Sequence, residues 1–138
     1  MNENMTRVLV DMSCTLLHHG HIRLLKKAAE HGYVIVALTT DEEILSYKGY
    51  LPELNYEQRA EIVGAIRHVD EVIPSNWLIT DEFIEKNEID IFVHGDDNMN
   101  DIQSCEVKIF PRTLGISSTQ LRSGAQGIGT KKLNEFLS

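Results

Sequence analysis

Apolar positions in the first third of the chain form two short runs with a helical pattern between them. Residues 7–12 are a β-branched run, and residues 33–39 are almost continuously apolar, which is typical of a strand covered on both faces of a parallel sheet. The helical pattern is carried by Ile22, Leu24, Leu25, Ala28 and Ala29. Gly32 supplies a usual helix stop, so this stretch has the order and length of one βαβ unit.

The rest of the chain repeats this alternation. Asn55 can cap a helix whose apolar positions are Ala60, Ile62, Val63, Ala65 and Ile66. Further strands are expected at 69–74, 89–94 and 106–110, with helices over 81–87 and from Ser117 onward. Five strands that alternate with helices predict an α/β fold, a doubly wound, Rossmann-like domain with a five-stranded parallel sheet.

The size and composition of the chain fit one domain. It has 138 residues and 15.7 kDa, with 42% apolar and 25% charged residues, which is the balance of an ordinary globular protein. We expect residues 1–138 to form a single domain, with a core over about 7–121 and a tail over 124–138. The net charge of −8 argues against nucleic acid and against an anionic membrane surface as partners.

The ends and the cysteines of the chain predict its compartment. The first five residues are polar, and no apolar run approaches the ~20 residues that cross a bilayer. Cys14 and Cys105 are expected to be free thiols, because a chain of this size needs no disulfide staples. These features predict a cytoplasmic protein.

Polar and glycine-rich segments follow several of the predicted strands. They cover residues 13–21, 39–41, 94–97 and 112–119. In a doubly wound sheet, ligands bind outside the carboxyl ends of the strands, at the switch in strand order. This rim of the sheet is therefore the candidate site.

The first candidate motif is His18-His19-Gly20-His21, at the turn into the first predicted helix. His18 and His21 are three positions apart and share a face of a helical turn. Gly20 lets a ligand approach the backbone, and a helix N-terminus favours phosphate. Solvated histidines are the plainer interpretation. A zinc site is a third, and it would need His94, Asp96 or Asp97 as further ligands.

The second candidate motif is the run from Arg112 to Thr119, RTLGISST. An arginine, a glycine turn and three hydroxyls at a helix start make a second phosphate cradle. The plainer interpretation is a simple helix cap, for which one serine would suffice.

HxGH after the first strand, with RTxGISST after the fifth, resembles the small cytidylyltransferases of the HxGH nucleotidyltransferase superfamily. The similarity runs from about Arg7 to Leu121. Residues 69–74, 91–93 and 95–97 are similar to the glycerol-3-phosphate cytidylyltransferases. Other segments are more similar to the cytidylyltransferase domains attached to phosphoenolpyruvate mutases in phosphonate pathways; these are residues 12–13, 17–22, 46–48 and 56–59.

The resemblance implies a role for each matching residue. The catalytic groups it implies are His18, His21, Lys48 and Arg112. The CTP-binding residues it implies are Met12, Ser13, Gly20, Asp96, Asp97, Thr113, Ser117, Ser118 and Thr119. The acceptor-binding residues are Lys48, Arg59, Arg67 and Trp77. The resemblance also implies Mg²⁺ bound with CTP, no metal ligands from the protein, and a homodimer.

The basic residues agree in part with these roles. Arg59 and Arg67 are eight positions apart, about two helical turns, so a continuous helix would place them on one face. They could equally be solvated surface arginines. Trp77, the only tryptophan, can wall an acceptor pocket or fill the core. The acidic run 81–88 is expected to be a solvated helix face.

Three features depart from the family pattern. Thr15 stands where the family usually has aspartate, which bears on the metal end of the site. Tyr50 replaces a second loop lysine, and the stretch between Asp97 and Cys105 is shorter than in the glycerol-phosphate enzymes. All three changes bear on the acceptor side more than on the nucleotide side.

The predicted function is CMP transfer from CTP to a small phosphorylated alcohol, with release of pyrophosphate. Glycerol-3-phosphate or a similar polyol phosphate is the first choice of acceptor. The runner-up is a small phosphonate, 2-aminoethylphosphonate or 2-hydroxyethylphosphonate. Two further functions fit the same motifs, namely adenylyl transfer and a non-catalytic nucleotide-binding module. The charge of −8 does not oppose a polyanionic ligand, because the excess acid lies mainly outside the candidate site.

Overall fold

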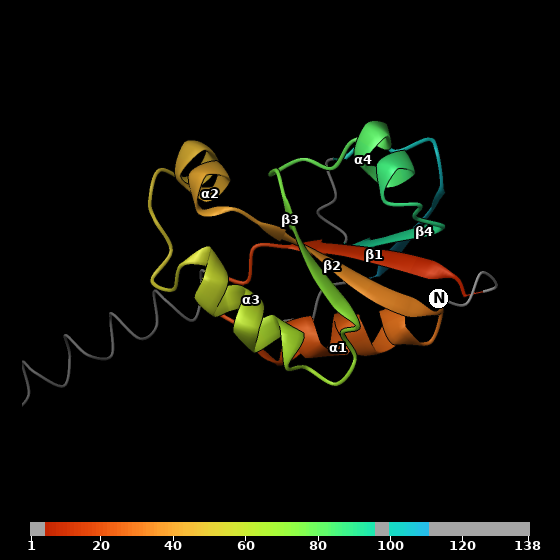
Figure 1. Cartoon of the computed structure of the whole chain (residues 1–138), viewed down its shortest axis with the longest axis horizontal. Helices are drawn as coiled ribbons and strands as arrows, with labels where there is room; N and C mark the ends of the chain where they lie inside the picture. Colours follow the sequence, from red (N-terminus) through yellow and green to blue (C-terminus); the bar gives the residue numbers. More distant parts are fainter. Residues whose placement is uncertain (1–4, 96–99, 111–138) are drawn as a thin grey trace, which may run out of the picture.

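A computed structural model describes residues 5–95 and 100–110 (Figure 1). The elements are β1 (Arg7–Met12), α1 (His19–Ala29), β2 (Tyr33–Thr39), α2 (Asp41–Lys48), α3 (Tyr56–Gly64), β3 (Glu71–Ser75), α4 (Asp81–Lys86), β4 (Ile91–Gly95) and β5 (Glu106–Phe110). The predictions for Asp96, Asp97, Arg112, Thr113, Ser117, Ser118 and Thr119, and for the C-terminal helix and tail, lie outside the described residues.

The five strands form one parallel sheet in the order β3-β2-β1-β4-β5. The predicted fold class, a doubly wound α/β domain, is confirmed. The chain adds β2 and β3 on one side of β1 and then returns to add β4 and β5 on the other side. The switch in strand order therefore falls between β1 and β4, and this is where a ligand crevice is expected.

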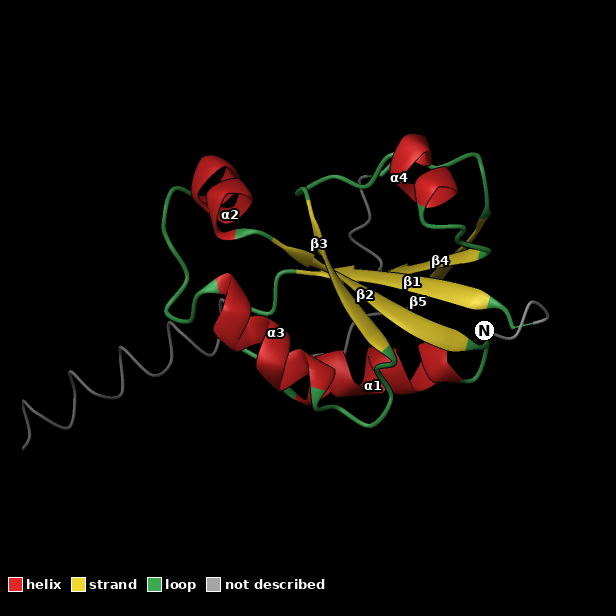
Figure 2. Cartoon of the chain, viewed as in Figure 1, coloured by secondary structure: helices red, strands yellow, loops and turns green. Residues whose placement is uncertain are grey.

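Helices cover the two faces of the sheet in pairs. Figure 2 shows α1 and α3 on one side of the sheet and α2 and α4 on the other. Alternate residues of the central strand enter separate cores, because successive side chains of a strand point to opposite faces. Val8 and Val10 pack in the core that holds Leu25 of α1 and Val63 of α3. Leu9 packs in the core that holds Ile84 of α4.

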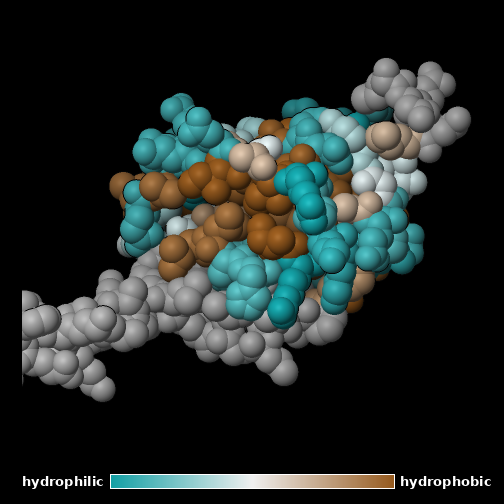
Figure 3. Space-filling view, turned by 90° about the horizontal axis from the view of Figure 1, so that it is seen from below, coloured by the Kyte–Doolittle hydropathy of each residue, from teal (hydrophilic) through white to brown (hydrophobic). Residues whose placement is uncertain are grey.

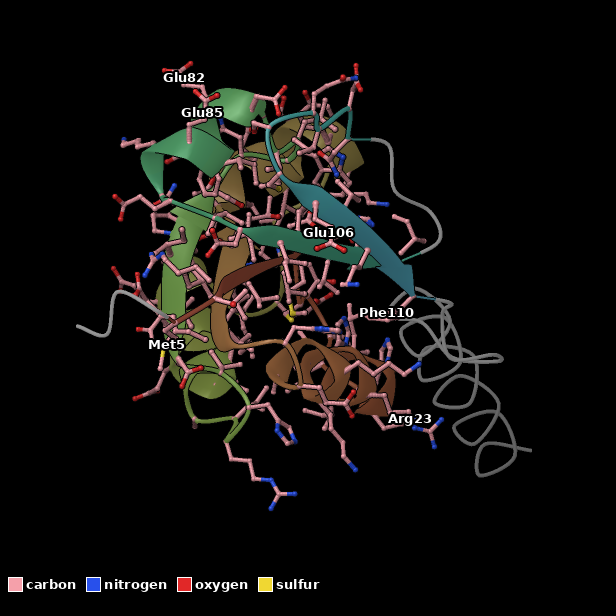
Figure 4. The ribbon with its side chains drawn as sticks, turned by 90° about the vertical axis from the view of Figure 1, so that its right-hand side faces the viewer. Met5, Arg23, Glu82, Glu85, Glu106 and Phe110 are labelled. Carbon is pink, nitrogen blue, oxygen red and sulfur yellow. The ribbon has the colours of Figure 1, made fainter. Side chains whose placement is uncertain are left out.

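The outer surfaces differ between the two sides. Figure 3, viewed from the side of α1 and α3, shows apolar side chains across the middle of this face, with hydrophilic ones around them. Ile62 of α3 is among the exposed apolar residues. On the opposite side, Figure 4 shows Glu82 and Glu85 of α4 pointing away from the body of the protein. Glu82 and Glu85 are therefore solvated, as expected, whereas Asp81 accepts hydrogen bonds from the backbone of Gln103 and Ser104.

Three features of the chain differ from the sequence prediction. The stretch Asp41–Lys48 forms α2, where no helix was expected; Thr40 caps it, its Oγ1 accepting from Glu43 N, and Gly49 ends it at φ 80°. The helix capped by Asn55 ends at Gly64, short of the predicted Ile66. In β3, Pro74 lies inside the strand rather than closing it, which an edge strand tolerates because one side of it needs no ladder hydrogen bond.

Candidate active site

His18 and His21 close the amino end of α1 with a reciprocal capping box. His18 Nδ1 accepts a hydrogen bond from Gly20 N at 3.0 Å, and His21 Nδ1 accepts one from His18 N at 3.1 Å. Their ring centroids lie 4.0 Å apart. These contacts satisfy backbone N–H groups that a helix start otherwise leaves unpaired.

The capping box fixes the tautomer of both rings. Because each Nδ1 accepts from the backbone, the proton of each neutral ring is on Nε2. Two Nε2–H donors are thereby held side by side at a helix N-terminus, whose dipole favours an anion. His19 takes no part in the box and is exposed. The geometry suits hydrogen bonding to phosphate oxygens by His18 and His21.

Arg59 of α3 is buried, with an exposure of 1%. Its Nη1 donates to Ser13 O at 2.7 Å and to Thr39 O at 2.9 Å, so it joins the ends of β1 and β2. Its Nε donates to Leu54 O at 3.1 Å. Its Nη2 pairs with Asp41 Oδ1 at 2.6 Å. Arg59 is thus a positioning residue that holds the rim of the sheet to the starts of α2 and α3.

The prediction that Arg59 and Arg67 share a helix face is wrong. Because α3 ends at Gly64, Arg67 lies in the turn that follows the helix, and it is exposed. Among the interactions of the described residues, Arg59 has one N–H of Nη2 left for an acceptor. The two arginines therefore do not lie on one continuous helix face.

Lys48 and Trp77 come together at the outer edge of the rim. Lys48 is the last residue of α2 rather than part of a loop, and its Nζ lies 5.3 Å from the centroid of the Trp77 ring. The ring of Tyr47 stacks on Trp77 at 5.5 Å with an interplanar angle of 12°. Trp77 N donates to Glu43 Oε1 at 2.9 Å. Trp77 is half-buried and belongs to neither apolar core, so the prediction that it could fill the core is wrong.

The loop between β1 and α1 is anchored by buried residues. Met12 is buried, and its carbonyl accepts a hydrogen bond from Thr39 Oγ1 at 3.5 Å. Cys14 has a φ of 49° and is buried as a free thiol. Burial raises the pKa of Cys14 to about 12, although the positive charge of Arg59 acts in the opposite direction. Thr15 is also buried, at 7% exposure.

Asp11 and His94 form a contact that no sequence motif predicted. His94 Nε2 lies 3.0 Å from Asp11 Oδ1, between the carboxyl ends of β1 and β4. Both residues end apolar runs at the rim, and this is the sequence signal that could have found them. Within residues 5–95 and 100–110, no group of three His, Cys, Asp or Glu side chains could hold a metal ion. The zinc interpretation gains no support from this part of the chain.

Comparisons with known proteins identify the family of this chain. Residues 15–124 match the cytidylyltransferase-like family model. The chain belongs to this family. It is 41% identical to the glycerol-3-phosphate cytidylyltransferase of Staphylococcus aureus over 135 residues, covering 92% of this chain and 100% of the relative. The Bacillus subtilis enzyme of the same name is also 41% identical, over 90% of this chain and 100% of the relative.

Two further proteins are more distantly similar to this chain. An ethanolamine-phosphate cytidylyltransferase of Mus musculus is 34% identical over 87% of this chain, which covers 32% of that relative. A lipopolysaccharide core biosynthesis protein from Thermoplasma volcanium superposes with a TM-score of 0.70 at 20% identity, covering 80% of this chain and 99% of that one. The latter shows the fold alone. The predicted cytidylyltransferase resemblance is confirmed, and this family member is a nucleotidyltransferase.

No helix in the described part of this cytidylyltransferase-like chain is long and apolar enough to cross a membrane.

Proposed function

We propose that this protein transfers CMP from CTP to the phosphate of glycerol-3-phosphate, forming CDP-glycerol and pyrophosphate. The chemistry is supported by the pair of Nε2–H donors that His18 and His21 hold at the start of α1. The choice of acceptor is supported by the similarity to two glycerol-3-phosphate cytidylyltransferases. The chain is 41% identical to each and covers the full length of both.

The reaction needs no covalent intermediate on the protein. A phosphate oxygen of the acceptor attacks the α-phosphorus of CTP, and the bond from this phosphorus to the oxygen bridging the β-phosphorus breaks. Pyrophosphate leaves with the electron pair of that bond. The attacking oxygen is already ionised, so no general base is required. Catalysis then consists of positioning the reactants and stabilising charge.

The proposed roles follow from where the groups lie. His18 and His21 donate hydrogen bonds to the α-phosphate and to the leaving pyrophosphate. Lys48 ends α2 with an exposed side chain, and its ammonium is proposed to contact the reacting phosphates while it stays beside the Trp77 ring. Arg112, which lies outside the described residues, is proposed to bind the nucleotide phosphates together with the RTLGISST motif.

Mg²⁺ is proposed to enter with CTP rather than on ligands from the protein. Thr15 offers a buried hydroxyl where the family usually has a carboxylate, and the described residues contain no cluster of acidic ligands. Mg²⁺ in such sites is commonly held by substrate phosphates, whose charge it neutralises. Binding of Mg²⁺ through the phosphates of CTP agrees with the described side chains, which offer no acidic cluster for the ion.

The acceptor is proposed to be a neutral polyol phosphate rather than a cationic one. The ammonium of Lys48 lies over the Trp77 ring, the position that a cationic acceptor head would otherwise take. A positively charged head group would also be repelled by Lys48. The polyol of glycerol-3-phosphate meets neither obstacle. A homodimer and a cytoplasmic location complete the proposal.

A pyrophosphate-release assay tests the proposal. Each of the four nucleoside triphosphates is paired with glycerol-3-phosphate, ethanolamine phosphate, 2-aminoethylphosphonate and 2-hydroxyethylphosphonate. CTP with glycerol-3-phosphate should give the highest kcat/KM. A higher value with either phosphonate would replace the proposed acceptor, and a higher value with ATP would replace the nucleotide. Nucleotide binding without release in every pairing would leave a non-catalytic module.

A further inference from the structure

Asp11 and His94 join two strands across the switch point of the sheet. Val10 of β1 pairs with Val93 of β4, so Asp11 and His94 follow one step closer to the carboxyl ends. The side chains lie on the face of the sheet that carries Leu9 and Phe92, and their exposures are 11% and 17%. His94 Nε2 is 3.0 Å from Asp11 Oδ1. A partly buried ionisable pair thus lies at the carboxyl ends of β1 and β4, where a ligand crevice is expected.

The surroundings of His94 define its protonation. Its Nδ1 lies 3.0 Å from Gly95 O, and a carbonyl oxygen only accepts, so Nδ1 carries a hydrogen. Its Nε2 faces a carboxylate, where a ring lone pair would be repelled. A hydrogen on Nε2 as well would let the ring donate to both Gly95 O and Asp11. It contacts β1 through Asp11 and the last peptide of β4 through Gly95.

The pair is incomplete in the described part of the protein. Asp11 Oδ1 is buried but accepts no well-aligned hydrogen bond from the described residues, despite its short distance to His94 Nε2. Such orphaned buried oxygens are costly and rare in native proteins, and each needs an explanation. Hydrogen bonds at active sites are often poorly aligned without ligand and tighten in the complex. An unaligned pair at the carboxyl ends of β1 and β4 fits this behaviour.

We infer that Asp11 and His94 are positioning residues for the CTP side of the site. The pair fixes the carboxyl end of β4 at Gly95, where the chain enters the Gly95-Asp96-Asp97 segment that the family resemblance assigns to the nucleotide pocket. The inference rests on the proposed function for the use of CTP. It adds two residues that neither the resemblance nor the family match assigned to the site.

The chain offers a matched control at the other end of the same strands. Asp90 precedes β4, and its Oδ2 accepts a hydrogen bond from Arg7 N of β1 at 2.9 Å. Asp90→Asn and Asp11→Asn therefore make the same chemical change in a carboxylate that links β1 to the β4 segment. Only Asp11 lies at the carboxyl ends, so only its effect should reach the nucleotide.

The test compares wild type, Asp11→Asn, His94→Leu and Asp90→Asn. Calorimetry with Mg-CTP gives the Kd, and steady-state rates give the KM of each substrate. Loss of positioning should raise the Kd and KM for CTP in Asp11→Asn and His94→Leu roughly ten- to hundredfold. The KM for glycerol-3-phosphate should stay within twofold, and Asp90→Asn should leave all three constants unchanged. His94→Gln keeps a donor toward Asp11 and should recover part of the CTP affinity.

A second measurement needs no variant to fold. In wild type, ¹⁵N NMR should show a hydrogen on Nδ1 of His94, as its contact with Gly95 O requires. A His94 ring without a hydrogen on Nδ1, or an equal rise in Kd in Asp11→Asn and Asp90→Asn, would overturn the inference. Wild type that binds CTP but transfers nothing to any acceptor would overturn only the proposed function. Wild type that does not bind CTP would overturn both.

Discussion

Arg59 Nη2 lies 2.6 Å from Asp41 Oδ1, and this ion pair joins α3 to the first residue of α2. Asp41 uses its other oxygen, Oδ2, to accept a hydrogen bond from Tyr56 N at the start of α3. The arginine also binds the carbonyl of Ser13, which leads into the histidine motif. One buried guanidinium therefore sets the relative positions of the histidine loop and of the helix that ends in Lys48.

We predict that Arg59→Lys strongly destabilises the protein. A single ammonium cannot reach the three carbonyls and the carboxylate that the planar guanidinium contacts, so buried acceptors lose their donors. Breaking a buried, hydrogen-bonded ion pair costs about 3–5 kcal/mol. Chemical denaturation of Arg59→Lys should show a loss of this order. The control is Arg67→Lys, which is exposed and should stay within about 0.5 kcal/mol of wild type. Equal stabilities of the two variants would contradict the positioning role.

The capping box predicts that stability and turnover can be separated at His18. In His18→Asn, a good N-cap residue still accepts from the helix start, so the free energy of unfolding should stay within about 0.5 kcal/mol of wild type. In His18→Ala, the lost cap should cost about 1 kcal/mol. Both variants lack the Nε2–H donor and should lose turnover alike. Urea titrations and pyrophosphate release on the same samples measure the two effects. Full turnover by His18→Asn would exclude the ring as a phosphate donor.

We expect His21→Ala to abolish detectable turnover while the protein stays folded. Removing one preorganised donor to developing charge typically costs on the order of 10²–10³ in rate. His19→Ala is the matched control, because His19 is the exposed neighbour that takes no part in the capping box. Pyrophosphate release by His19→Ala should be close to that of wild type. A near wild-type rate in His21→Ala, with circular dichroism unchanged, would move the site elsewhere.

The sequence predicted the strands better than it predicted the rim of the sheet. Residues 33–39 are almost continuously apolar, and they form the fully covered strand β2. Asp41–Lys48 has no comparable pattern: Ile44 is its only buried residue, so α2 is set by its cap and by the ion pair of Asp41. Arg59 was predicted to bind the acceptor or to be a solvated surface arginine, since arginine is rarely fully buried. Its partners are backbone carbonyls and a carboxylate distant in sequence, and no local pattern announces them.

The raised pKa of Cys14 predicts a loss of stability at high pH. Burial raises this pKa from 9.0 to about 12, so the folded state favours the neutral thiol. The contribution to stability is full below about pH 9 and is lost as the pH rises toward 12. Urea unfolding at pH 8 and pH 10.5 should show wild type weakening more than Cys14→Ala does. Ellman's reagent should label Cys105 in the native protein well before the buried Cys14. Equal labelling rates would contradict the burial of Cys14.

We predict that Gly32→Ala, which adds a single methyl group, strongly destabilises the fold. Its φ is +152°, and a Cβ there would lie 2.3 Å from the carbonyl oxygen of Thr6, which accepts the hydrogen bond of Tyr33 N at 2.8 Å. In Gly32→Ala the backbone must shift at the point where β2 starts beside β1, and we expect a loss of about 2–4 kcal/mol. Gly64→Ala is the matched control, because its Cβ would meet only Val72 Cγ2 at 3.8 Å, inside a helix that alanine favours. It should be neutral or stabilise the protein by up to about 1 kcal/mol. A melting temperature of Gly32→Ala equal to that of Gly64→Ala would show that the close approach to Thr6 is not required.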